Sequence, residues 1–245
     1  MRNCATALGI VGLAMAVGLG AQAAAPHVFS LTFDDSGNPG QDSSGNGNDA
    51  TLNGGATWVA GGQSGGAIQF DGVDGYVEVE MDVPEFNFTM GLWIQTEDPA
   101  AGVYSVLDGI AGAGGHDRHF YLDGGNICFR VWQGAGWCTT TGVADGAWHH
   151  IALVAMDGEG QHAYVDGVDI GVFDYDHSDF DWQKRVWIGF SNDGANSYFT
   201  GLIDGVTYTD AALSQDDVVD ELMSTAVEPQ GKLTTTWGGV KTDYR

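Results

Sequence analysis

Residues 65–80 read GGAIQFDGVDGYVEVE, two apolar stretches separated by a glycine-rich bend. Apolar and polar residues alternate within each stretch, as in Val77-Glu78-Val79. A period of two is typical of a β-strand that buries one of its faces. The bend holds two Asp-Gly dipeptides, and both residue types tolerate the positive φ angles of tight turns. We therefore expect two strands joined by a turn.

The same pattern continues along the chain. Nine Asp-Gly dipeptides separate alternating apolar runs, and 39 of the 245 residues are glycine. Ser214 and Asp217 have the spacing of a capping box, which predicts one short helix near the C-terminus. Many short strands with tight turns indicate an all-β sandwich or barrel. The predicted strands are residues 28–33, 67–71, 76–80, 86–96, 103–107, 119–122, 127–132, 148–156, 161–165, 185–190 and 199–208.

The N-terminus has the features of a secretory signal peptide. Arg2 is followed by an uncharged apolar run from Ala7 to Gly20, and Ala21-Gln22-Ala23 has the small-x-small pattern of a cleavage site. The run is too short for a membrane span. We expect cleavage after Ala23, a domain over residues 24–224, a tail over residues 225–245, and export to the periplasm or the extracellular space without membrane insertion.

The charge balance excludes some classes of partner. The chain has 33 acidic and eight basic side chains, which gives a formal net charge of −25. A field of this sign repels nucleic-acid phosphates and anionic lipids, and it favours cations. The alternative is that the charge only keeps an exported protein soluble.

Two cysteines follow the predicted signal peptide, Cys128 and Cys138. Each lies five residues from Gln133, within a pattern typical of a hairpin with a glycine-rich turn. Outside the cytoplasm an even number of cysteines permits a disulfide. We predict a bridge between the two strands with a structural role.

A series of sequence blocks, taken in order, resembles the LamG-like jelly-roll domain of the concanavalin A-like lectin/glucanase superfamily. The resemblance implies two antiparallel sheets packed face to face, a fold shared by lectins, adhesion modules and glucanases. The blocks are Leu31–Asp35, Asp42–Asn48, Gly65–Gly72, Tyr76–Val79, Phe88–Ile94, Trp148–Val154, Tyr164–Gly167, Trp187–Gly189, Gly201–Val206 and Ala212–Ser214.

Three acids in this frame suggest an enzymatic alternative. Glu78, Glu80 and Asp82 alternate along a strand and therefore share one face. Laminarinase-type glucanases of the superfamily carry acids in this rhythm, in the order Glu, Asp, Glu, for a nucleophile and an acid. Here the order of residue types differs, and the acids lie where the LamG-like pattern has an ordinary strand. An acidic outer face explains them without catalysis.

A polar loop suggests a metal site. Asp42, Asn46 and Asn48 supply hard oxygen donors within a glycine-containing loop, as calcium prefers. The resemblance implies a structural calcium ion that joins this loop to the last long strand, where Asp204 is the matching acid, with Asp34 and Asp35 as further contributors. The alternative is a loop that caps itself with its own side chains.

Sugar sites combine aromatic faces with carboxylate and amide groups, and five residues are candidates for such a site: Tyr104, Trp132, Trp137, Asn192 and Asp193. The hypothesis is a non-catalytic binding module, stabilised by calcium, that recognises a glycan or an extracellular protein. The alternatives are a divergent glycan hydrolase on the same fold and a structural or adhesion scaffold of an envelope or matrix.

Overall fold

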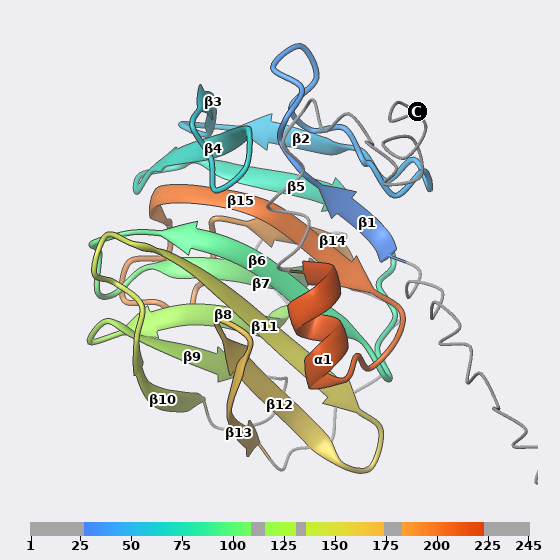
Figure 1. Ribbon diagram of the computed structural model, residues 1–245. Helices are drawn as coiled ribbons and strands as arrows, with labels where there is room; N and C mark the ends of the chain where they lie inside the picture. Colours follow the sequence, from blue (N-terminus) through green and yellow to red (C-terminus); the bar gives the residue numbers. More distant parts are fainter. Residues whose placement is uncertain (1–26, 109–115, 131–135, 174–182, 223–245) are drawn as a thin grey trace, which may run out of the picture.

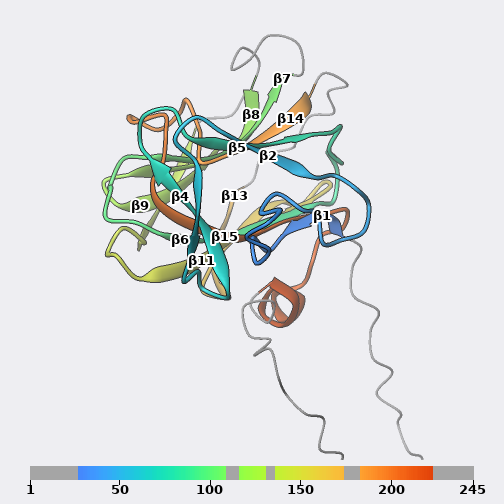
Figure 2. The same ribbon diagram turned by 90° about the horizontal axis from the view of Figure 1, so that it is seen from above.

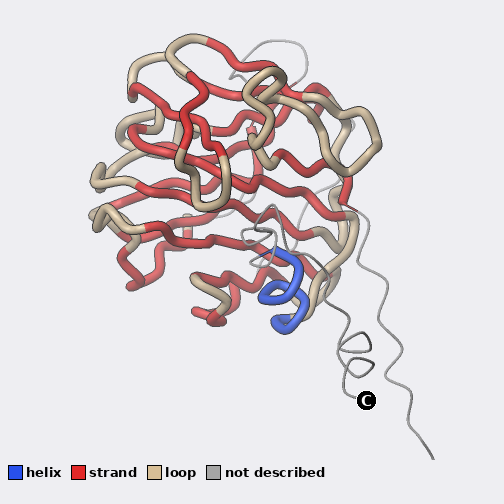
Figure 3. The backbone as a smooth tube through the Cα atoms, turned by 45° about the horizontal axis from the view of Figure 1, so that its top comes forward, coloured by secondary structure: helices blue, strands red, loops and turns tan. Residues whose placement is uncertain are grey.

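A computed structural model describes residues 27–108, 116–130, 136–173 and 183–222. Strands dominate the fold (Figures 1 and 3). The predicted signal peptide, the predicted tail from residue 225 and Trp132 lie outside the described residues.

Two antiparallel sheets pack face to face, which confirms the predicted sandwich (Figure 2). Sheet A has the order β13 (Val168–Phe173), β12 (Gly160–Val165), β11 (Trp148–Met156), β6 (Thr89–Gln95), β15 (Thr200–Thr209), β4 (Gly66–Asp71) and β3 (Thr57–Ala60), and β1 (His27–Leu31) pairs with β15. Sheet B has the order β10 (Trp137–Gly142), β9 (Asn126–Arg130), β8 (His116–Asp123), β7 (Gly102–Asp108), β14 (Gln183–Ile188), β5 (Tyr76–Glu80) and β2 (Ala50–Asn53).

The stretch of residues 65–80 forms two strands as predicted, but they do not form a hairpin. β4 belongs to sheet A and β5 to sheet B, so the bend carries the chain from one layer to the other. Asp71 shapes this bend, because its Oδ1 accepts hydrogen bonds from the backbone N–H groups of Val73, Asp74 and Gly75. These bonds lower the pKa of Asp71. A side chain that closes its own turn redirects the chain without strand pairing.

The core lies between the sheets and follows the predicted alternation. Ile68 and Phe70 of β4 and Val77 and Val79 of β5 are at most 1% exposed. The intervening Glu78 is partly exposed and faces away from the core. Each sheet therefore has an inner apolar face and an outer face on which polar side chains are placed.

One short helix covers part of the outer face of sheet A, as Figure 2 shows. It comprises α1 (Gln215–Asp217) and the π-helical turn η1 (Val218–Leu222). The predicted capping box is present between Ser214 and Asp217. Val218 packs against Ala152 and Val154 of β11. Among the described residues no helix combines the length and apolarity needed to span a bilayer.

The predicted disulfide is confirmed. Cys128 and Cys138 are directly opposite in β9 and β10 and are bonded to each other. The bridge ties β10, the edge strand of sheet B, to its neighbour.

Candidate functional site

The candidate ligand site lies on the outer face of sheet B. The chain from Phe190 to Tyr198 folds back over this face after β14 and is held by several strands. Ser105 of β7 donates a 3.0 Å hydrogen bond from Oγ to the carbonyl of Phe190, and the Oγ of Ser191 lies 2.8 Å from Nδ1 of His119 in β8. The backbone N–H of Gly102 donates to the carbonyl of Asn196 at 2.7 Å. This loop is therefore positioned rigidly on the sheet.

Two of the predicted ligand residues lie on this loop. Asn192 is exposed, and Asp193 is half-buried and forms an ion pair with Arg130 of β9. Tyr121 of β8 lies close enough that the charge of Asp193 contributes to raising its pKa, after the larger effect of burial. We call Tyr121, Arg130, Asn192 and Asp193 the Asp193 site. It combines a partly exposed ring, a cation, an amide and a carboxylate on one face.

The prediction that Tyr104 binds ligand does not fit its position. Its side chain is 0% exposed and belongs to the sandwich core, where its ring contacts Phe120 edge to face at 5.6 Å between centroids. Burial raises its pKa well above the ordinary value. The 190–198 loop covers the outer face of β7, so both faces of this strand are buried. Its sequence therefore does not show which side chains point toward the core.

Trp137 lies inward at the edge of the sandwich rather than on the outer face. Its ring stacks on Phe129 of β9 and on Phe173 of β13, with centroid distances of 5.8 and 6.0 Å. It thereby closes the gap between the edge strands of the two sheets. Trp132, the remaining aromatic candidate, lies outside the described residues.

Glu78 and Glu80 lie on the outer face of sheet B, as their spacing predicts, whereas Asp82 lies just beyond the end of β5. Glu78 accepts hydrogen bonds from the indole N–H of Trp187 and, at 3.5 Å, from Arg185. Asp82 forms an ion pair with Lys184. Glu80 is exposed beside a depression of about 300 Å³. Two of the three carboxylates therefore have a cationic partner.

The predicted calcium ligands do not form one group. Both oxygens of Asp42 accept hydrogen bonds from within its own loop and from β1: Oδ1 from the N–H groups of Ser30 and Ser44, and Oδ2 from the Ser44 hydroxyl and the Asn48 N–H. Burial raises the pKa of Asp42, but these bonds outweigh it and the pKa is lowered. The side-chain amides of Asn46 and Asn48 donate to backbone carbonyls of β1. This is the geometry of the self-capping alternative.

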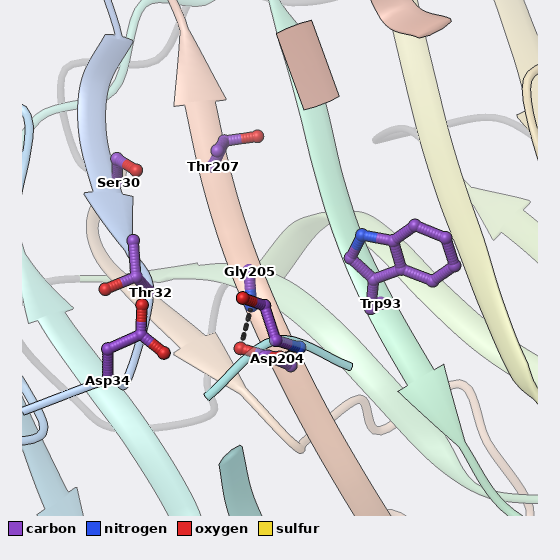
Figure 4. Close-up of a pocket in the computed structure, with 8 residues that line it drawn as sticks. Ser30, Thr32, Asp34, Trp93, Asp204, Gly205 and Thr207 are labelled. Carbon is purple, nitrogen blue, oxygen red and sulfur yellow. Dashed lines mark hydrogen bonds between the residues drawn. The ribbon is translucent and has the colours of Figure 1, made fainter. Parts of the chain in front are cut away.

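Asp204 of β15 lines a separate cavity on the outer face of sheet A (Figure 4). The cavity holds about 10 Å³, which is enough for one water molecule or ion. Asp34, the hydroxyls of four Ser and Thr residues and the indole of Trp93 surround it. No residue of the Asp42 loop is among the residues that line it: Ser30, Thr32, Asp34, Ser64, Trp93, Asp204, Gly205 and Thr207.

The carboxylate of Asp204 is 2% exposed and has no cationic side chain as a partner among the described residues. It accepts hydrogen bonds from the backbone N–H groups of Ser64 and Gly205, at 3.0 and 2.7 Å. Burial, with a smaller contribution from Asp34, raises its pKa to about 7. A buried acid beside a second acid is costly to ionise unless a cation compensates the charge.

Trp93 lines this cavity, His150 packs against Trp93, and both are buried. Within the described part of the chain, neither the Trp93 Nε1 nor either ring nitrogen of His150 has a hydrogen-bond partner. The two rings meet edge to face at 5.2 Å between centroids. Burial lowers the pKa of His150 to about 4, against a smaller raising effect of Asp166.

Sequence analysis missed Arg130 and the aromatic residues around Trp187. One feature of the sequence pointed to Arg130: basic residues are scarce in this chain, and few of its strands carry one. The aromatic residues around Trp187 had no such signal, because the stacking of Tyr76 on Trp187 joins two strands that lie far apart in the sequence.

Comparisons with known proteins agree with the fold. The family described as the concanavalin A-like lectin/glucanases superfamily matches residues 70–219. No curated protein sequence matches the chain significantly.

Three similar solved structures illustrate the range of proteins that share this fold. Domain 4 of an extracellular arabinanase from Geobacillus stearothermophilus, in complex with arabinotriose, has a TM-score of 0.63 at 17% identity, over 80% of this chain and 98% of that domain. The binding domain of Paraclostridial Mosquitocidal Protein 1 has a TM-score of 0.62 at 16% identity, over 79% of this chain and 51% of that one. Trypanosoma rangeli sialidase, in complex with sialic acid, has a TM-score of 0.63 at 14% identity, over 88% of this chain and 36% of the sialidase chain.

Proposed function

The chain belongs to the concanavalin A-like lectin/glucanase superfamily, and on this basis we propose that it is a non-catalytic binding module whose ligand is a glycan. The Asp193 site carries the proposal. A rigid loop presents the exposed Asn192 and the half-buried Asp193 next to Arg130 and Tyr121. Amide, carboxylate and guanidinium groups match sugar hydroxyls, and a partly exposed ring offers a surface to the C–H face of a sugar.

The similar structures support this class of ligand without identifying it. The arabinanase domain was solved with arabinotriose, and another neighbour is a binding domain. An extracellular protein is the alternative partner, consistent with export through residues 1–23. A scaffold role through the tail from residue 225 would show as loss of surface retention when the chain is truncated there.

A glycan hydrolase is the second candidate function, because one domain of an arabinanase and 36% of a sialidase chain are among the similar structures. One observation disfavours a catalytic pair at Glu78 and Asp82. Each carboxylate has a cation beside it. A general acid, in contrast, needs surroundings that favour its protonated form.

Calcium is proposed at the cavity of Asp34 and Asp204 rather than at the Asp42 loop. The cavity offers two carboxylates and several hydroxyl oxygens, the donors that calcium prefers, and its buried negative charge lacks a cationic side chain among the described residues. The oxygens of Asp42 are already engaged in hydrogen bonds. When bound, the ion would compensate the charge of Asp204 and tie β15 to the chain that follows β1.

A glycan array with the exported protein, followed by calorimetry on the bound sugar, tests the proposed function. We expect Asn192→Ala to weaken binding about tenfold, as loss of one or two well-placed hydrogen bonds does. Gln69→Ala, at an exposed position of sheet A, is the matched control and should bind like the wild type. Release of reducing sugar that Glu80→Gln abolishes would instead establish the hydrolase.

A further inference from the structure

A cluster of four aromatic side chains and one leucine lies on sheet B outside the sandwich core. Leu107, Trp187 and Phe190 form it, and Tyr76 and Tyr198 pack against them. The same strands send Val79 and Val186 into the core, so the cluster occupies the opposite, outer face. This is the layer of β5, β14 and β7 in Figure 2.

The rings of this cluster hold one another in place. Tyr76 stacks on Trp187 with 3.9 Å between centroids, and Phe190 contacts both Trp187 and Tyr198 edge to face at 5.0 Å. Trp187 and Phe190 are only 8% and 4% exposed, whereas Tyr76 and Tyr198 remain partly exposed. The two tyrosines are thus the accessible surface of a fixed aromatic platform, which binds at low cost in conformational entropy.

The platform continues in both directions along the face. On one side the Arg185 guanidinium lies 5.4 Å from the centre of the Trp187 ring and lines the depression of about 300 Å³ beside Glu80. On the other side Phe190, held on β7, is followed in the chain by Asn192 and Asp193 of the Asp193 site, which lie over β8 and β9. Depression, platform and Asp193 site therefore follow one another across the outer face of sheet B, in the strand order β5, β14, β7, β8 and β9, and together form a strip.

Each basic residue of the strip is paired with a carboxylate of the protein. Arg130, Lys184 and Arg185 pair with Asp193, Asp82 and Glu78 respectively. An anionic sugar would have to displace one of these carboxylates, and it would also approach a chain with a net charge of −25. The strip favours an uncharged ligand.

Resting on the proposed function, we infer that Tyr76 and Tyr198 form a second sugar subsite, and that the ligand is an uncharged linear oligosaccharide spanning this platform and the Asp193 site. A sugar unit stacks on the tyrosines through its C–H face. A single sugar fills only the Asp193 site, so affinity rises with chain length.

Calorimetry with mono- to hexasaccharide ladders of arabino-, cello- and laminari-oligosaccharides tests this inference, with a heparin hexasaccharide as the anionic comparison. We expect tighter binding as the bound ladder lengthens, and no comparable binding of the heparin fragment. Tyr76→Ala should weaken binding of the hexasaccharide about tenfold, the size of one aromatic contact, and leave binding of the shortest bound member unchanged. Tyr76→Phe keeps the ring and should retain the affinity.

Tyr198→Ala is a second test at a different position of the platform and should give the same pattern if its melting temperature shows an intact fold. Length-independent binding, or a Tyr76→Ala protein that binds the hexasaccharide like the wild type, would overturn the subsite and leave the proposed function intact. Binding of heparin as tight as that of the neutral ladder would overturn the uncharged ligand. A protein that binds no member of any ladder contradicts the proposed function itself.

Discussion

The outer faces of the two sheets handle charge in opposite ways. All four Lys and Arg residues of the described chain belong to strands of sheet B: Arg118, Arg130, Lys184 and Arg185. Three of them pair with a carboxylate, and Arg118 is fully buried beside the Phe88 ring. The strands of sheet A have no Lys or Arg, and their most buried acid, Asp204, has no cationic side chain beside it in the described residues. Three basic residues of sheet B are each paired with a carboxylate of the protein, whereas the buried Asp204 of sheet A needs an external ion or a proton to compensate its charge.

The largest expected effect is the pH dependence of stability in calcium-free protein, which arises from Asp204 and His150 on sheet A. Asp204 has a folded-state pKa of about 7 against an ordinary 3.8, so between pH 3.8 and 7 the folded state binds more protons than the unfolded state. The contribution of Asp204 to the stability of the protein therefore falls as the pH rises through this interval. His150 has a folded-state pKa of about 4 against an ordinary 6.5, so between pH 4 and 6.5 the unfolded state binds more protons than the folded state. The contribution of His150 to the stability of the protein therefore falls as the pH falls through this interval. The Asp204 contribution amounts to roughly 4 kcal/mol and the His150 contribution to roughly 3 kcal/mol, and the two oppose each other between pH 4 and 6.5.

Substitution separates the two contributions. With chelator present, the His150→Phe protein should gain stability relative to the wild type as the pH falls from 6.5 to 4. The Asp204→Asn protein should lose stability over the same interval. Urea unfolding at several pH values measures both, and parallel curves for the three proteins would contradict the buried state of these groups.

The next effect sharpens the contrast between the two predicted calcium regions. A hundredfold excess of calcium over its Kd should stabilise the protein by about 2.7 kcal/mol, which raises the melting temperature by roughly 5 to 10 °C. Asp204→Asn should abolish this response. Asp42→Asn should lower the melting temperature with and without calcium but keep the response, because Asp42 only caps its loop. If the response is lost in Asp42→Asn and kept in Asp204→Asn, the assignment is reversed.

A smaller effect is confined to sheet B. Removing the bridge in a Cys128→Ala, Cys138→Ala protein should cost about 2 kcal/mol, because the closed loop is short. The loss should weaken ligand binding on sheet B and leave the calcium response of sheet A unchanged. Differential scanning calorimetry and ligand calorimetry on the same protein measure both. A change in the calcium response would mean that the two faces are coupled.

Local patterns predicted the elements of the candidate site better than their partners. Asn192 and Asp193 follow a strand and precede a glycine, which is enough to place them in an accessible turn. Arg130, the partner of Asp193, lies 63 positions away in sequence, and only the pairing of β8 with β9 and the return of the 190–198 loop bring it close. The prediction for Tyr104 was wrong for a different reason. β7 is covered on both faces, so its sequence has no alternation of apolar and polar residues that indicates where its rings point.

The amino-acid sequence by itself determined the strand periods, the cap of the helix and the facing cysteines, because each depends on residues within about ten positions of one another. It also determined the excess of negative charge, which is a sum over the chain and needs no structure. The tertiary structure decided which sheet received β4 and β5, which carboxylates shared a cavity, and which rings remained accessible. These features depend on contacts between strands distant in the chain. The cavity around Asp204 exists only after β1, β6 and β15 have come together in sheet A, and Tyr76 stacks on Trp187 only after β5 has paired with β14 in sheet B.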